Sequence, residues 1–332
     1  MRCHLIISHA IWPDAAESAR IGTGLLLPAL AMLAGRGRRE TFVPAPTRDW
    51  LGQCFGLADF PAAPLLLASV APHEQSGYWL RADPVHLAIN QHGAEMADPA
   101  ALAISQDEAT QLLAALNAQF AEDGLRFVAA DPQSWLLYVG SKPDVMFTPL
   151  DAVYGCTVHD HLPHGTDAAH WHRLLNEIQM LLHGHAVNDA RANRNQLLIN
   201  SIWPWGGGEY PLPAKLPRPA GIVYADDAGL NSLATLSGAY TGGCPASLDQ
   251  IEGKDIWVVL DDLARPAQWG DAASWREAWR GLEQHWLQPA RRMLWQGTMR
   301  ELHLTLPEAG ITITARRADL LRLWRRSWLP WR

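Results

Sequence analysis

Short apolar runs bounded by polar residues recur along the chain and predict buried strands. Apolar residues at helical spacing predict one helix over Gly24–Ala34 and another over Ala168–Leu182. Between these helices and after them, the pattern returns repeatedly to strands, so we expect a fold that mixes both element types. The predicted strands are Leu5–Ser8, Leu125–Val128, Trp135–Gly140, Gly221–Ala225, Asp255–Leu260 and Leu302–Leu306.

Capping residues mark the starts of two further helices. Asp14 precedes the sequence AAESAR, where a carboxylate can accept hydrogen bonds from the first N–H groups of a helix. Ser105 is followed three residues later by Glu108, which is the pattern of a capping box. We expect the helix after Ser105 to end near Gly124.

Length, composition and charge narrow the class of protein. A chain of 332 residues exceeds the size at which a single hydrophobic core usually divides, so we expect two domains. Hydrophobic residues make up 48% of the chain and charged residues 18%, as in globular proteins. The net charge of −7 opposes a general nucleic-acid binder, because phosphate contacts require a basic excess.

The cysteines and the apolar runs indicate a cytoplasmic protein. Cys3, Cys54, Cys156 and Cys244 lie far apart and form no metal-type pair, which favours reduced thiols. The apolar run at the start is short for a signal peptide and is followed by His9. No run reaches the roughly 18 apolar residues of a membrane span, so we expect no transmembrane segment.

Histidines are concentrated in the middle of the chain and raise the question of a metal site. Their spacing is irregular, since side chains two residues apart on a helix, such as His170 and His172, project about 200° apart. We therefore expect no metal there. The group comprises His159, His161, His164, His170, His172, His183 and His185.

Residues 181–211 carry the most specific motifs. Gly206, Gly207 and Gly208 permit positive φ and a close approach of the backbone, to a ligand or within a tight turn. The segment resembles the archaeal-type cofactor-independent phosphoglycerate mutases of the alkaline phosphatase superfamily. The matching residues are His185, Asn188, Arg191, Asn200, Ile202, Trp203, Trp205, Gly206 and Gly208.

Further matches extend the resemblance from about Gly77 to Pro289. The segment Trp79–His86 resembles the entry to the family's inserted substrate domain, where Arg81 could hold a phosphate or pair with Asp83. Asp151 keeps an acid that the family has. The resemblance implies an alkaline-phosphatase-like α/β core with a mainly parallel sheet and helices on both faces. It also implies a smaller α+β domain inserted at residues 79–193, with residues 1–78 and 194–332 forming the core.

The family's metal ligands are missing at the matching positions. Ala264 and Gln268 stand where the family has an aspartate and a histidine, and Ser8 and His9 replace an aspartate-glycine pair. The chain thus resembles the bacterial RpfE-type regulatory branch, whose active site is eroded. We expect no cofactor and a non-catalytic protein, for which the resemblance suggests a regulatory role. The alternative is an active mutase or phosphatase with two manganese or zinc ions held by other residues.

The ligand that we expect is an anionic or phosphorylated small molecule. Asn188 and Arg191 share one face of a helical turn, and Arg191 with the glycine backbone would form an anion site. Without such a site, Arg191 would pair with Asp189 or Glu209. The resemblance implies these ligand-binding residues: Arg81, Asp151, His185, Asn188, Arg191, Asn200, Trp203, Trp205, Gly206 and Gly208.

The segment after residue 315 is basic and aromatic, which allows two interpretations. It could contact an anionic surface, or a protein partner if the chain is a scaffold. The favoured interpretation is an amphipathic helix that docks on the protein through its apolar residues. Those residues are Leu320, Leu321, Leu323 and Trp324.

Overall fold

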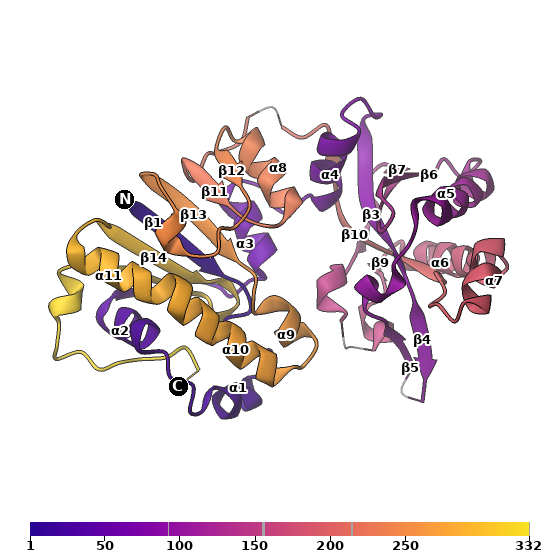
Figure 1. The fold of residues 1–332 in the computed structure, drawn as a ribbon. Helices are drawn as coiled ribbons and strands as arrows, with labels where there is room; N and C mark the ends of the chain where they lie inside the picture. Colours follow the sequence, from indigo (N-terminus) through magenta and orange to yellow (C-terminus); the bar gives the residue numbers. More distant parts are fainter. Residues whose placement is uncertain (92, 155–156, 214, 332) are drawn as a thin grey trace. The chain divides into compact units, whose positions relative to one another are not determined.

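The computed structural model describes residues 1–91, 93–154, 157–213 and 215–331. The chain forms two compact units (Figure 1). The first unit combines Met1–Asp59 with Ala214–Arg332, and the second is Phe60–Pro213. In sequence, the second unit therefore interrupts the first.

The second unit contains the whole of the expected insertion, residues 79–193, and further elements on both sides of it. These are the helix α4 (Ala62–Val70) and the strand β10 (Ser201–Tyr210). Both pack against β3 (Gly77–Val85), and β10 is its antiparallel partner in the sheet. The pairing of β10 with β3 explains why the second unit extends beyond residue 193.

A seven-stranded sheet forms the centre of the first unit, in the order β12-β11-β13-β1-β14-β15-β2. The strands from β12 to β14 run parallel, whereas β15 and β2 are antiparallel to their neighbours. The predicted mixed fold with a mainly parallel sheet is confirmed. The strands are β1 (Arg2–Ile7), β2 (Arg38–Thr41), β11 (Ile222–Tyr224), β12 (Tyr240–Gly242), β13 (Asp255–Leu260), β14 (Glu301–Leu306) and β15 (Ile311–Ala315).

Helices cover both faces of this sheet (Figure 1). Cys3, Leu5 and Ile7 point to the face where the main core contains residues of α2, α10 and α11. On the other face, Trp50 of α3 stacks on Trp257 with 5.9 Å between ring centroids. The helices are α1 (Ala15–Gly22), α2 (Pro28–Arg36), α3 (Thr47–Cys54), α8 (Ala228–Leu236), α9 (Ala264–Gln268), α10 (Ala272–Leu282) and α11 (Gln288–Gln296).

A buried carboxylate caps α2, whose own N-cap residue supplies no side-chain hydrogen bond. Glu283 lies in a π-helical turn, Glu283–Leu287, between α10 and α11. Its side chain accepts hydrogen bonds from the N–H groups of Ala29 at 2.6 Å and Leu30 at 3.1 Å. A negative charge at a helix N-terminus is stabilising, so this contact fixes α2 against the α10–α11 pair.

The second unit has an α+β fold with a four-stranded antiparallel sheet in the order β10-β3-β7-β6. The apolar stripe of α6 is buried as its spacing predicts. The remaining strands are β4 (Leu87–Asn90), β5 (Gly93–Met96), β6 (Arg126–Asp131), β7 (Ser134–Gly140), β8 (Val145–Met146) and β9 (His164–Gly165), and the helices are α5 (Gln106–Phe120), α6 (Ala168–His183) and α7 (Ala186–Asn193).

Both predicted helix caps are confirmed. Asp14 accepts hydrogen bonds from the first turn of α1, and Ser105 and Glu108 form both arms of a capping box on α5. Cys3, Cys54 and Cys244 are free thiols, whereas Cys156 lies outside the described residues. Among the helices that the structure describes, none is both long and apolar enough to cross a membrane.

The prediction of an amphipathic helix after residue 315 is wrong. After β15, the only regular element of this described segment is a short 3₁₀ turn, Asp319–Leu321. Of the four predicted docking residues, Leu320 alone is buried, whereas Leu321, Leu323 and Trp324 are exposed. Instead, Trp331 anchors the segment by packing edge-on against Trp275 and Trp279.

Candidate functional site

The parallel strands of the first unit bring a group of acidic and hydroxyl residues to one edge of the sheet. β1, β11, β13 and β14 end at this edge, which we call the carboxyl edge. Ligands of open α/β sheets bind outside the carboxyl ends of the strands. The residues that follow these strands are Ser8, His9, Asp226, Asp227, Asp261, Asp262 and Glu308.

Ser8 and Asp261 form the centre of the carboxyl edge, because β1 and β13 are neighbours. The Ser8 hydroxyl donates to Oδ1 of Asp261. Burial raises the pKa of Asp261, and the nearby carboxylate of Asp227 raises it further, although the Ser8 hydrogen bond and Arg48 oppose the shift. Asp261 is therefore a stronger base than an exposed aspartate.

Glu308, which follows β14, links the start of α3 to the loop that follows β1. Its Oε1 accepts hydrogen bonds from the backbone N–H of Thr47 at 3.2 Å and from its hydroxyl at 2.7 Å, at the start of α3. Its Oε2 accepts the backbone N–H of His9 at 3.1 Å. Both carboxylate oxygens are thus engaged by the protein itself.

His9 has a backbone conformation that is unusual for its residue type. Its φ is +52°, in the left-handed region, and its carbonyl accepts a hydrogen bond from Trp275 Nε1 at 3.1 Å. Its buried Nδ1 has no hydrogen-bond partner among the described residues and lies 3.9 Å from Glu308 Oε1. Such outliers are concentrated at functional sites, which supports this edge as the candidate site.

Asp226 and Asp227, which follow β11, contact Cys244 and Arg48. Arg48 Nη2 lies 3.7 Å from Asp227 Oδ2, and Asp226 Oδ1 accepts the N–H of Cys244 at 2.8 Å. Burial, then the charges of Asp226, Asp262 and Asp261, raise the pKa of the Cys244 thiol to about 12. Cys244 is therefore protonated at neutral pH and is a poor nucleophile.

The acids at the carboxyl edge do not form a metal site. Asp261, Glu308 and Asp226 each accept a hydrogen bond from a different protein donor. Among the residues that the structure describes, no three His, Cys, Asp or Glu side chains come together as a metal-binding group, and this includes the described histidines of the second unit. The residues present thus do not fit the two-ion centre that the family resemblance implies.

Arg191, the main expected anion ligand, is completely buried in the second unit. Its Nη1 donates to Glu108 Oε2 at 2.9 Å, its Nε to the carbonyl of Leu197 at 2.7 Å and its Nη2 to the carbonyl of Leu102. The partner is neither Asp189 nor Glu209. The guanidinium is used to join α7 to the start of α5.

Three neighbouring residues of the motif have similar structural roles. Asn188 joins Leu182 to Ile199 through its amide, with distances of 2.7 to 2.8 Å. Asn200 pairs with both backbone groups of Leu87. His185 is the N-cap of α7, where its Nδ1 accepts an N–H. These contacts give each of the three residues a structural role.

Arg81, Asp83 and Trp205 form a compact group on β3 and β10. Arg81 donates to Oδ1 of Asp83 at 2.6 Å, and Trp205 Nε1 donates to Oδ2 at 2.7 Å. The Arg81 guanidinium also lies 5.3 Å from the Trp205 ring centroid. Burial raises the pKa of Asp83, although Arg81 opposes this. The expected Arg81–Asp83 pair exists, and 17% of the Arg81 side chain remains exposed.

The triple glycine lies inside β10, where it forms a bulge against β3. Gly206 has φ +59°, and a β-carbon there would lie 2.7 Å from Ala62 Cβ. At Gly208, a β-carbon would lie 2.8 Å from Pro61 Cβ. The glycines therefore allow the start of α4 to pack closely against β10.

Two expected site residues lie elsewhere in the second unit. Trp203 is buried, and its Nε1 donates to the carbonyl of Thr148 at 2.8 Å. Asp151 is half-buried in a 3₁₀ turn, Leu150–Ala152. The ligand role of the ten expected residues stays a prediction.

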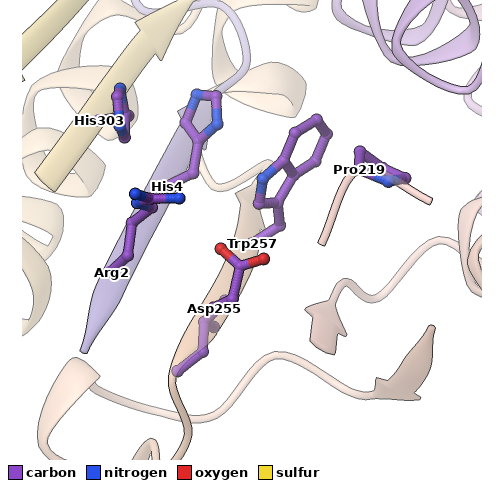
Figure 2. Close-up of a pocket in the computed structure, with 7 residues that line it drawn as sticks. Arg2, His4, Pro219, Asp255, Trp257 and His303 are labelled. Carbon is purple, nitrogen blue, oxygen red and sulfur yellow. The ribbon is translucent and has the colours of Figure 1, made fainter. Parts of the chain in front are cut away.

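The first unit also has a pocket of about 300 Å³ at the amino ends of the strands, opposite the carboxyl edge (Figure 2). His4 lies between Trp257 and His303 on adjacent strands, and its Nε2 is 2.7 Å from Thr305 Oγ1. Burial, with a smaller effect of His303, lowers the pKa of His4 to about 3. His4 is therefore neutral under ordinary conditions.

Sequence reasoning missed Thr47, Arg48, Asp227 and Glu308 as members of one site. Their place in the sequence could have indicated two of them, because Asp227 and Glu308 each follow a strand within a few residues. Thr47 begins a helix after the sequence PAP and had no comparable signal.

The chain is similar in sequence to phosphoglycerate mutases. It is 27% identical over 146 residues to a probable 2,3-bisphosphoglycerate-independent phosphoglycerate mutase of Geobacter sulfurreducens. It is 30% identical over 154 residues to the 2,3-bisphosphoglycerate-independent phosphoglycerate mutase of Methanosarcina acetivorans. These segments are 44% and 45% of this chain, and 37% of each relative's length. No protein-family model matches the chain.

A solved structure shows the same fold. A protein from Pyrococcus horikoshii is 12% identical, with a TM-score of 0.50 over 99% of this chain and 91% of that one. For the cofactor-independent phosphoglycerate mutase of Thermoplasma acidophilum, the identity is 14%, the coverage 99% and 94%, and the TM-score 0.48. The sequence relatives are thus phosphoglycerate mutases, as the motifs indicate, while the RpfE-type branch stays a prediction.

Proposed function

We propose that this chain is a degenerate, phosphoglycerate-mutase-like protein that binds an anionic or phosphorylated small molecule without catalysing metal-dependent phosphoryl transfer. The observation that carries the proposal is the arrangement of the carboxyl edge. Asp261, Glu308 and Asp226 accept hydrogen bonds from three separate protein donors. Phosphoryl transfer by this superfamily would need those groups to converge on metal ions. A regulatory role of the RpfE type fits a protein that retains the fold but has Ala264 and Gln268 where the resemblance implies metal ligands.

Arg81 is the best candidate for contact with the anion. Asp83 and Trp205 hold its guanidinium in one orientation, and part of the side chain stays exposed. A planar guanidinium of fixed orientation is a good partner for a carboxylate or phosphate, because little freedom is lost on binding. Arg191 is a weaker candidate, since its donors already bind protein groups.

Calorimetric titration with 3-phosphoglycerate tests the proposal. We expect binding by the unmutated chain and a loss of about 1.5 to 3 kcal/mol in Arg81→Gln, the usual contribution of a charged hydrogen bond. Arg126→Gln is the matched control, because Arg126 lies on β6 of the same sheet and forms an exposed ion pair with Glu74. Arg81→Lys keeps the charge beside Asp83, and comparison of its stability with that of Arg81→Gln separates lost binding from misfolding.

Two results would contradict the proposal. If the unmutated chain shows no heat of binding with 3-phosphoglycerate, the proposed ligand class is wrong. If Arg81→Gln is folded and binds as well as Arg126→Gln, then the site is not at Arg81.

An active mutase or phosphatase is the second candidate function. It is favoured by two hydroxyls, of Ser8 and Thr47, that donate to carboxylates at the carboxyl edge. A hydroxyl beside a carboxylate can become a nucleophile when a base removes its proton. Turnover of a phosphorylated substrate that disappears in Thr47→Val would establish this function instead.

A further inference from the structure

An exposed apolar surface lies on the segment that follows β15 in the first unit. Leu321, Leu323 and Trp324 are 58%, 74% and 79% exposed. On either side of them, Leu320 and Leu329 are buried and hold the segment against the protein. Single exposed apolar residues are ordinary, but here three occur within four positions, and we call these three residues the apolar patch.

Arginines flank this patch in the sequence and also occur in residues 36–39, although the whole chain has a net charge of −7. The segment lies against residues 36–39, because Arg325 Nη1 donates to the carbonyl of Gly37 at 2.9 Å and the Arg39 guanidinium lies 3.8 Å from the Trp328 ring centroid. We call the combined surface the basic apolar surface. It contains Leu321, Leu323 and Trp324 with Arg36, Arg38, Arg39, Arg316, Arg317, Arg322, Arg325 and Arg326.

Acidic partners neutralise only some of these arginines. Arg316 pairs with Glu301, Arg322 with Asp319 and Arg38 with Glu40. Within the part of the chain that the structure describes, no acidic side chain forms an ion pair with Arg325 or Arg326. The surface thus keeps a positive charge beside its apolar residues.

We propose that the basic apolar surface docks the protein on an anionic lipid bilayer. Interfacial binding combines apolar side chains buried at the headgroup boundary with cations that contact acidic headgroups. Tryptophan is favoured at this boundary because its ring is apolar and its N–H is polar. Arginines alone would also suit a nucleic acid, but an exposed Leu321 and Leu323 have no role on a phosphate backbone. The leucines therefore favour the bilayer.

The position of the surface leaves the carboxyl edge at the other end of the sheet. Ala315, the last residue of β15, pairs with Leu302 near the start of β14, whereas Glu308 follows the end of β14. A bilayer bound at the basic apolar surface would therefore leave Ser8 and Glu308 at the opposite end of the first unit. This proposal does not depend on the function proposed above.

Vesicle co-sedimentation of the full chain tests the proposal at low and high salt. One set of vesicles contains phosphatidylcholine alone, and the other contains equal parts of phosphatidylcholine and phosphatidylglycerol. We expect binding to the acidic vesicles only, weakened by salt. Arg325→Gln with Arg326→Gln should reduce the partition coefficient about 25-fold, about fivefold per arginine. Leu323→Ser with Trp324→Ser should reduce it at least about tenfold, because interfacial binding scales with buried apolar area.

Matched controls lie on the first unit away from the surface. Tyr240→Ser changes a residue that is 76% exposed on β12, the opposite edge strand from β2. Lys215→Gln with Lys254→Gln removes two exposed positive charges elsewhere. Both controls should bind acidic vesicles as the unmutated chain does, and thermal melting should show that every variant is folded.

The proposal is overturned by any of three results. The unmutated chain could fail to bind acidic vesicles. The controls could lose as much binding as the matched variants, which would show that net charge or nonspecific adsorption causes the binding to vesicles. Finally, salt-dependent binding to duplex DNA without binding to vesicles, unaffected by Leu323→Ser with Trp324→Ser, would assign the surface to nucleic acid.

Discussion

Arg191→Ala separates a structural role of this residue from a ligand role. The Arg191 side chain is 1% exposed and donates to Glu108 and to two backbone carbonyls. Removing one partner of a buried ion pair costs about 3 to 5 kcal/mol, and each buried carbonyl left without a donor costs about 1 to 3 kcal/mol. Glu108 keeps its bonds to Ser105 and Arg194, which reduces the first contribution. We therefore expect a loss of about 3 to 5 kcal/mol in unfolding free energy.

Arg194→Ala is the matched control because Arg194 binds the same carboxylate at 3.0 Å while its side chain is 55% exposed. An exposed pair of this kind contributes less than about 1 kcal/mol. Guanidinium denaturation followed by circular dichroism measures both variants, and unequal midpoints at similar slopes report a stability difference. Equal midpoints for the two variants would refute the structural role. Normal stability with lost 3-phosphoglycerate binding would return Arg191 to the ligand site.

Three further predictions concern the first unit. Glu283→Ala should lower the free energy of unfolding by about 2 to 4 kcal/mol, because two buried N–H groups of α2 lose a charged acceptor. Glu277→Ala, at an exposed position, is the control. Equal melting temperatures for the two variants would contradict the role of Glu283 as a cap. The pKa of His4 is about 3 in the folded protein, below its value near 6.5 in the unfolded chain. The stabilisation from neutral His4 is therefore complete above about pH 6.5. Below that pH, the free energy of unfolding falls by about 1.4 kcal/mol per pH unit until about pH 3. His4→Gln should flatten that slope in acid denaturation, and an unchanged slope would show that His4 is not responsible. Elemental analysis of the purified protein should give well under one equivalent of manganese or zinc, and two tightly held ions per chain would support the active mutase.

Local sequence patterns were sufficient for several elements. The apolar run Asp255–Leu260 coincides with β13, and the Ser105–Glu108 box starts α5. Both depend on residues that are neighbours in the chain. The same local reasoning failed for Leu321, Leu323 and Trp324, since the segment is held by Leu320 together with Leu329 and Trp331, which lie outside the predicted stripe.

The candidate site could not be assembled from the sequence. Ser8 and Asp261 are 253 residues apart, and they meet only because β1 and β13 are adjacent in the sheet. Strand order is a property of the whole fold. The triple glycine indicated a close backbone approach to a ligand or to protein; in the structure Ala62 and Pro61 lie against it, and the ligand role of these glycines stays a prediction. Local sequence does not tell these partners apart, because both require the missing β-carbon.

The central claim is that the chain binds a phosphorylated small molecule without converting it. Phosphorus NMR of 3-phosphoglycerate, recorded with the purified chain and added manganese at a concentration low enough to keep the lines resolved, tests both parts at once. The account predicts that the 3-phosphoglycerate resonance shifts or broadens with the unmutated chain, less so with Arg81→Gln, and that no 2-phosphoglycerate or inorganic phosphate signal develops. A growing 2-phosphoglycerate or phosphate signal, or a resonance that the chain leaves unchanged, would contradict it.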